Sequence, residues 1–214
     1  MMEELHDYVY STEVLEFVKK CKYFTDLLDA PLPEERKEFA IELLKILPGL
    51  YGDMIGLPVR EPVLDAENEK FVTEEKWSEI FQKVSVNLGS QNEYVDVPEE
   101  EEYDRLDVIS RELSEDIADV YQDIKDFIEV FRVGTEEVMN DVLWECRINF
   151  ENYWGTKLLR ASLNLHKIMI RDEETLEKMD REFEEKSSKK EIRADEWHLT
   201  KRQNETRDDG EIQS

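Results

Sequence analysis

Apolar side chains recur every three to four residues along two stretches of this sequence, residues 113–131 and 135–165. This is the spacing of helices that pack into a core. In the first stretch the apolar positions fall within an arc of about 120° at 100° per residue, and Gly134 then ends the helix. Thr135 caps the second stretch, which is apolar nearly all round, so we expect that helix to lie at the centre of the fold. The sequence therefore predicts an all-α protein.

Three further helices are predicted from capping and helix-stopping residues, with bounds near 11–30, 33–51 and 73–89. Residues 52–72 carry two glycines and two prolines, which indicates a long connection. Residues 90–102 are polar and acidic, which indicates a solvated loop. We predict a single-domain helical bundle of about five helices.

The composition changes after the last predicted helix. Residues 171–214 hold 10 basic and 15 acidic residues and few apolar ones, which predicts a charged tail with one short helix to about residue 185 and then disorder. We therefore expect a helical bundle domain over residues 1–170 and a charged, partly disordered C-terminal tail over residues 171–214. The bundle itself holds 39 acidic and 18 basic residues, so −21 of the formal charge of −26 belongs to it.

This charge limits the partners that the chain can have. A strongly negative field repels nucleic acids and anionic lipid surfaces and attracts a basic protein. One special class of acidic protein mimics double-stranded DNA and uses its negative field to occupy the DNA site of another protein.

The N-terminal sequence and the cysteines bear on where the chain works. The start MMEELHDYVY has no signal-peptide pattern, and no apolar run approaches the roughly 18 residues of a membrane span. Cys21 and Cys146 lie among hydrophobic neighbours in predicted helices and are expected to be buried free thiols. We expect a cytoplasmic protein.

Three segments resemble a bacterial family of acidic all-helical proteins known only as a domain of unknown function. They are YVYSTEVLEFV, SEDIADVYQDIKDF and FRVGTEEVMNDVLWECRINFENYWGTKLLRASLNLH, and the resemblance covers about residues 8–168. It implies an all-helical fold. It carries over no catalytic residue, so any function must be argued from the side chains.

Acidic residues recur at spacings of three and four beside the apolar arc of residues 113–131. Five of them fall within about 80° of one helix side, where like charges repel each other. They are Glu112, Asp116, Asp119, Asp123 and Asp126.

One interpretation of this row is a metal site. Carboxylate oxygens suit Mg²⁺ or Mn²⁺, and paired acids on a helix can hold such an ion against phosphates. The candidate ligands are Glu112, Glu115, Asp116, Asp119 and Asp123, with Asp141 and Glu145 facing them from the next helix. The pattern is loosely similar to all-helical nucleoside-triphosphate pyrophosphatases, but a second Glu-x-x-Asp motif is missing.

The other interpretation is a solvated acidic face, partly paired with Lys125, Arg132, Arg147 or Arg160. In that case replacing Asp119 and Asp123 by Asn relieves repulsion, and stability stays equal or rises slightly.

A polar row also follows one side of the predicted helix 135–165. Buried polar groups must be hydrogen-bonded, so the row indicates either an internal network or a lined pocket. Its members are Glu145, Asn149, Asn152, Thr156 and Arg160.

The common catalytic motifs are absent from the sequence. The three histidines are far apart, which disfavours zinc or di-iron centres, and no glycine-rich phosphate loop or nucleophile elbow occurs. We therefore expect a non-enzymatic interaction or regulatory protein that presents an acidic face and needs no cofactor. The alternative is a Mg²⁺-dependent nucleotide-phosphate hydrolase.

Overall fold

The chain forms two compact units, residues 1–170 and 171–214. In the second unit residues 173–186 are helical. The disorder predicted beyond about residue 185 concerns residues that mostly lie outside the described ones. The computed structural model describes residues 2–58, 60–64, 68–96, 109–186 and 188.

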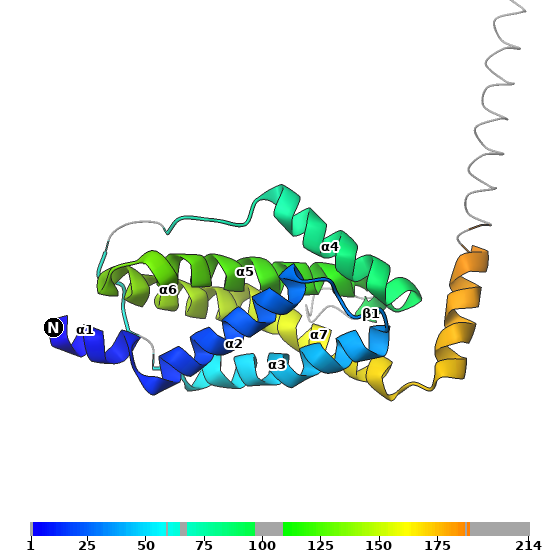
Figure 1. The fold of residues 1–214 in the computed structure, drawn as a ribbon, viewed down its shortest axis with the longest axis horizontal. Coiled ribbons are helices and arrows are strands. Elements are labelled where there is room, and N and C mark those ends of the chain that lie inside the picture. Colours follow the sequence, from blue (N-terminus) through cyan, green and yellow to red (C-terminus); the bar gives the residue numbers. More distant parts are fainter. Residues whose placement is uncertain (1, 59, 65–67, 97–108, 187, 189–214) are drawn as a thin grey trace, which may run out of the picture. The chain divides into compact units, whose positions relative to one another are not determined.

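Within its described residues, the first unit contains seven α-helices and one two-stranded hairpin (Figure 1). The predicted all-α class is confirmed. No described helix is long and apolar enough to cross a membrane. The elements are α1 Met2–Val9, α2 Thr12–Asp29, α3 Arg36–Gly56, α4 Glu74–Leu88, a 3₁₀ turn Gly89–Gln91, β1 Glu93–Asp96, β2 Ile109–Glu112, α5 Leu113–Val133, α6 Glu136–Asn149, a π-helical turn Phe150–Trp154 and α7 Gly155–Ile170.

Several predicted helix ends coincide with capping residues in the structure. The Ser11 hydroxyl accepts the Val14 N–H at the start of α2, and the Thr73 hydroxyl accepts the Lys76 N–H at the start of α4. Gly89 ends α4 with a positive φ of 54°, a conformation that favours glycine. Local chemistry therefore fixes these boundaries.

The number of helices exceeds the expected five for two reasons. The short helix α1 was not predicted, and a π-helical turn divides the predicted helix 135–165 into α6 and α7. In addition, α3 begins at Arg36 and extends to Gly56, beyond the predicted range.

The predicted loop 90–102 contains the end of the 3₁₀ turn and then, from Glu93, strand β1. Strand β1 pairs antiparallel with β2, with Glu93 opposite Glu112, while residues 97–102 lie outside the described residues. The hairpin is fastened to the first turn of α5 by Asn92, whose backbone and side-chain oxygens accept the N–H groups of Leu113 and Ser114 at 2.8 and 2.9 Å.

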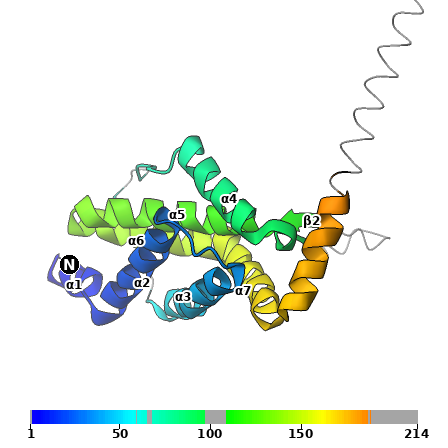
Figure 2. The same ribbon diagram turned by 45° about the vertical axis from the view of Figure 1, so that its right-hand side comes forward.

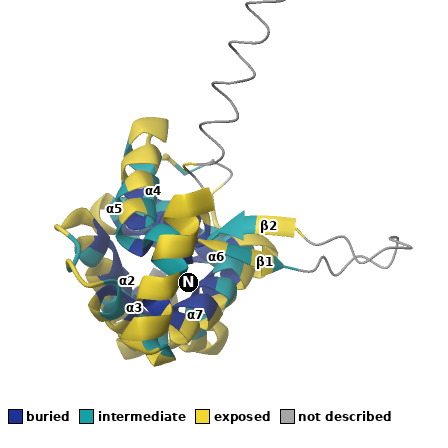
Figure 3. Ribbon diagram, turned by 90° about the vertical axis from the view of Figure 1, so that its right-hand side faces the viewer, coloured by how far each residue is buried: buried dark blue, intermediate teal, exposed yellow. Residues whose placement is uncertain are grey.

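Helix α5 has the most packing partners, because α2, α4, α6 and α7 all pack against it. We expected the helix of residues 135–165 to be central, but its two halves divide this role: α6 packs on α5 and α1, and α7 packs on α3 and α5. Figures 1 and 2 show α4 on one side of α5, and α3 with α7 on the other. The buried faces of the helices point toward one another in Figure 3. Both cysteines are buried free thiols, as expected, and burial raises the pKa of each.

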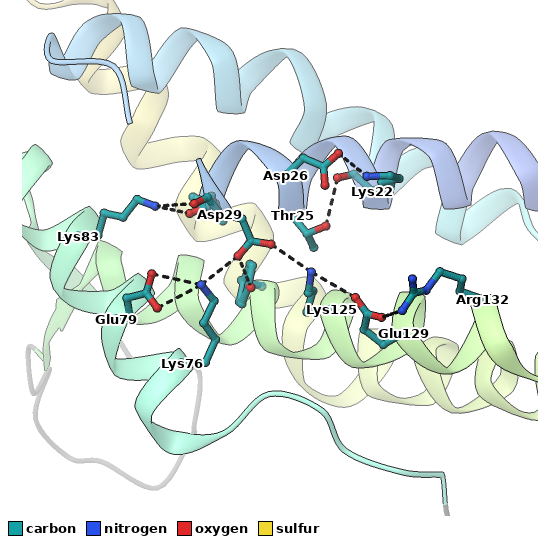
Figure 4. Close-up of polar contacts among 12 residues, drawn as sticks. Lys22, Thr25, Asp26, Asp29, Lys76, Glu79, Lys83, Lys125, Glu129 and Arg132 are labelled. Carbon is teal, nitrogen blue, oxygen red and sulfur yellow. Dashed lines mark hydrogen bonds and ion pairs between the residues drawn. The ribbon is translucent and has the colours of Figure 1, made fainter. Parts of the chain in front are cut away.

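Polar contacts attach α4 to the C-terminal end of α2 (Figure 4). The Lys83 ammonium donates to the Leu28 carbonyl at 2.6 Å, where the last carbonyls of a helix lack intrahelical donors. The Asp29 carboxylate pairs with Lys76 of α4 and Lys125 of α5, both at 3.1 Å, and it also accepts the Tyr121 hydroxyl at 2.7 Å. One exposed end of α2 thus connects three helices.

The π-helical turn places a large side chain in the core. The Gly155 N–H donates to the Phe150 carbonyl, five residues earlier. Trp154 is fully buried, and its indole N–H donates to the Cys146 carbonyl at 3.2 Å. A Cβ at Gly155 would lie 2.5 Å from the Phe150 oxygen and 2.9 Å from its ring, so only glycine fits this position without a shift.

We therefore expect Gly155→Ala to lower the free energy of unfolding by roughly 1–3 kcal/mol, as overpacking does. Gly52→Ala is the matched control, because that glycine lies in α3 with no atom within 4 Å of an added Cβ. It should stabilise the protein by about 0.5–1 kcal/mol, through helix propensity alone. Urea denaturation measures the free energy of unfolding of both variants. Equal changes in the two variants would contradict the prediction.

Candidate functional site

The acidic row of α5 faces other parts of the chain along most of its length. Asp116, Asp119 and Asp126 are only 2%, 6% and 5% exposed, and Asp123 is partly buried. Glu115, next to the row, is exposed. Ionised carboxylates are buried only where donors compensate for lost hydration, so each must have partners.

Asp119 is the best-connected of these carboxylates. One oxygen accepts the indole N–H of Trp77 at 2.8 Å. The other accepts the Tyr153 hydroxyl at 2.9 Å and the Lys157 ammonium at 2.5 Å. Burial lowers the pKa of Lys157, but Asp119 more than offsets this, and the pKa is raised overall. One side chain thus joins α4, α5, the π-helical turn and α7.

Asp116 connects α5 to the hairpin. Its carboxylate accepts the Tyr94 hydroxyl of β1, and burial raises the pKa of Asp116 despite this bond. Nearby, Asp96 of β1 accepts Arg111 of β2 at 2.8 Å and pairs with Arg160 of α7 at 3.0 Å. Asp116 of α5 and Arg160 of α7 therefore both hold the hairpin.

The remaining buried aspartates hold the long connection between α3 and α4 against the bundle. One Asp126 oxygen accepts the backbone N–H groups of Phe71 and Val72 at 2.7 and 2.8 Å. The two oxygens of Asp141 accept those of Val63 and Leu64 at 2.8 and 2.7 Å. Asp126 and Asp141 therefore act as backbone clamps.

Glu145 adds a side-chain contact to the same connection. It accepts the Asn68 amide at 2.6 Å and the Lys70 ammonium at 2.7 Å. Burial lowers the pKa of Lys70, but Glu145 outweighs this effect and the pKa is raised.

Asp123 differs from its neighbours, because a single amide, Asn149 at 2.8 Å, donates to it among the described residues. Burial raises the pKa of the Asp123 carboxyl to about 6, and the bond from Asn149 opposes the rise only in part. The side chain lines a small cavity of about 10 Å³ with Asp126 and Glu145, which is room for about one water molecule. This carboxylate is the least compensated of the four aspartates in the row.

The four cations expected beside the acidic face mostly pair elsewhere. Lys125 reaches Asp29 of α2, and the other three bind Glu129, Glu151 or Asp96. The cation that does pair with the row, Lys157, was missed by sequence reasoning. Its i, i+4 spacing from Tyr153 was the available signal, but nothing in the sequence indicated that this face of α7 meets α5 at Asp119.

The predicted polar row of α6 and α7 does not form one pocket. Glu145 and Asn149 line the small cavity, and Arg160 reaches the hairpin. Asn152 and Thr156 are exposed, and the Asn152 amide donates to the Ile148 carbonyl. The π-helical turn lies between Asn149 and Thr156 and interrupts the regular helical spacing.

The candidate metal ligands do not form one metal site either, although Asp123 and Glu145 line the same small cavity. Among the described residues, no group of three or more His, Cys, Asp or Glu side chains is arranged to hold a metal ion. Glu112 is the partly buried residue that precedes α5, and Glu115 points to solvent. The arrangement instead performs a structural task, in which the carboxylates of α5 gather donors from α4, β1, α6, the π-helical turn, α7 and the α3–α4 connection.

We predicted above that replacing Asp119 and Asp123 together by Asn leaves stability equal or slightly higher. The two carboxylates have different surroundings, so each replacement is now considered by itself. Asp119→Asn removes the charge that compensates Lys157, whose side chain is only 13% exposed, so we expect a loss of roughly 3–5 kcal/mol in unfolding free energy. Asp26→Asn breaks the exposed pair with Lys22 and should stay within about 1 kcal/mol of wild type. Chemical denaturation measures both, and a wild-type value for Asp119→Asn would show that the buried pair contributes nothing.

Asp123→Asn should act in the opposite direction. A folded pKa of about 6 lies above the ordinary value of 3.8, so the folded state takes up this proton first. The resulting stabilisation is present below about pH 4 and is lost as the pH rises through 6. At pH 8 the variant should exceed wild type by roughly 2–3 kcal/mol, the equivalent of two pKa units. Thermal melts from pH 4 to pH 8 test this prediction, because the stability difference between Asp123→Asn and wild type must grow with pH.

Comparisons with known proteins agree with this architecture. The model of a family described as a domain of unknown function, DUF5063, matches residues 8–171. The crystal structure of protein BF1032 from Bacteroides fragilis is similar, with 34% sequence identity and a TM-score of 0.68, over 78% of this chain and 98% of that one. The comparison with curated proteins gives no significant match. The chain therefore belongs to the DUF5063 family, which is described as a domain of unknown function.

Proposed function

We propose that this protein acts by binding rather than by catalysis, and that it presents an acidic surface to a basic partner protein. The observation that supports this most strongly is the use made of the buried carboxylates. Asp116, Asp119, Asp126 and Asp141 all accept hydrogen bonds from the chain itself. The residues that most resembled a catalytic set are thus engaged in holding the fold together.

The other acidic residues supply the surface charge. Among the acids whose burial is described, only these four aspartates are buried, and residues 1–170 carry a formal charge of −21. A field of this strength attracts basic proteins, accelerates their association and weakens as salt is added. The same field disfavours nucleic acids and anionic membranes, which fits a cytoplasmic protein that needs no cofactor.

The alternative hydrolase would place Mg²⁺ at Glu112, Glu115, Asp116 and Asp119. Both oxygens of Asp119 already accept protein donors, and Asp116 accepts Tyr94. An ion at this position would have to displace those donors. This competition favours binding as the function.

Two titrations test the proposal. Calorimetry with Mg²⁺ and Mn²⁺ should give no saturable heat, and nucleoside triphosphates should not be hydrolysed. A fluorescent lysine- and arginine-rich peptide should bind, with an affinity that falls as NaCl rises, while a glutamate-rich peptide of equal length should not. Saturable Mg²⁺ binding together with nucleotide hydrolysis by the wild-type chain would overturn the proposal.

A further inference from the structure

Two pockets adjoin the part of the α3–α4 connection that Asp141 holds in place. The first has a volume of about 310 Å³ and lies between α1, the connection and α6. The second has a volume of about 210 Å³ and lies between the connection, the end of α5 and the start of α6. Val63 and Asn140 line the first, and the next residues along the chain, Leu64 and Asp141, line the second. The two pockets are therefore adjacent.

The first pocket contains a buried acceptor without a donor. Asn140 is 1% exposed, and its amide nitrogen donates to the Glu61 carbonyl at 3.1 Å and to Asp141 at 2.9 Å. Its Oδ1 atom has no hydrogen-bond partner among the residues that the structure describes. Buried polar atoms are nearly always paired, so this oxygen would gain a partner if the Asn140 side chain turned toward an N–H donor in the pocket.

The charges around the first pocket favour a cation. Two carboxylates, Glu4 and Glu61, line it together with one guanidinium, Arg60. That guanidinium lies 5.0 Å from the centre of the Tyr8 ring, to which it is attracted as a cation. A lysine or arginine side chain would place its N–H groups near the acids and its aliphatic stem against Leu5 and Val63.

The second pocket is mainly apolar, and its walls are open to solvent. Leu64, Phe71 and Val133 are 42%, 41% and 70% exposed, and Val130 and Val138 complete the apolar lining. Contiguous exposed apolar side chains mark interaction sites on soluble proteins. Glu69 at the edge of this pocket adds negative charge.

We propose that the two pockets together form a docking site for a partner segment that carries a lysine or arginine next to a large apolar residue. The basic side chain occupies the Asn140 pocket and the apolar one occupies the Leu64 pocket. This inference rests on the proposed function, because it assigns a place to the basic partner. The clamp formed by Asp141 holds the segment between the pockets in position, so the site is organised before binding.

The test is an NMR titration of the full-length chain with four synthetic peptides that differ only at two central residues: Arg-Leu, Arg-Ser, Ser-Leu and Glu-Leu. The Arg-Leu peptide should bind most tightly and shift the amide signals of Val63, Leu64 and Asn140. Loss of either side chain should weaken binding by about tenfold, the loss of one anchor.

Matched variants locate the site. Glu61→Lys should weaken Arg-Leu binding about tenfold and Ser-Leu binding little, and Val133→Ser should weaken both. Glu34→Lys and Val86→Ser make equivalent changes at exposed positions outside both pockets and should bind like wild type. If Glu34→Lys weakens binding as much as Glu61→Lys, the attraction is diffuse, and the docking site is overturned while the proposed function stands. If no basic peptide binds, both fail.

Discussion

The fold depends on carboxylates that are buried on one side of α5 and on the neighbouring turn of α6. Each is a strong acceptor in a setting where an unpaired charge would cost several kcal/mol, so each requires donors from nearby segments. Asp119 obtains them from α4, the π-helical turn and α7, and Asp126 obtains them from the backbone of the connection. Because the acids recur every three to four residues, they align these segments along a single helix.

This use of acidic residues changes how the charge of the protein is understood. The buried acids beside the apolar arc of α5 are part of the structure. Under the proposed function, the acids elsewhere on the surface attract the basic partner. Backbone clamps such as Asp141 hold the described parts of the α3–α4 connection against the bundle, although those parts contain no helix or strand. A segment that is fixed in this way can carry a binding site, because the residues at the clamp, Val63 and Leu64, are held in place.

The π-helical turn has a similar organising role in the second half of the bundle. It adds one residue between α6 and α7, so that Asn149 faces the cavity beside Asp123 while Arg160 reaches the hairpin. It also brings Tyr153 toward Asp119 and buries Trp154. A regular helix through the same residues would have placed the polar side chains in one continuous row, as the sequence pattern predicted.

The sequence by itself determined α2, α4, α5 and the start of α6, because these depend on neighbours within one or two turns. Ser11, Thr73 and Gly89 act locally, and the apolar arc of α5 follows from its own spacing. Only the tertiary structure decided that the acidic row is buried. The donors for Asp119 lie 42 residues before it and 34 and 38 residues after it, and those for Asp126 lie more than 50 residues away. In an isolated helix these acids would face water, and they become acceptors for the rest of the fold only when distant segments pack against α5.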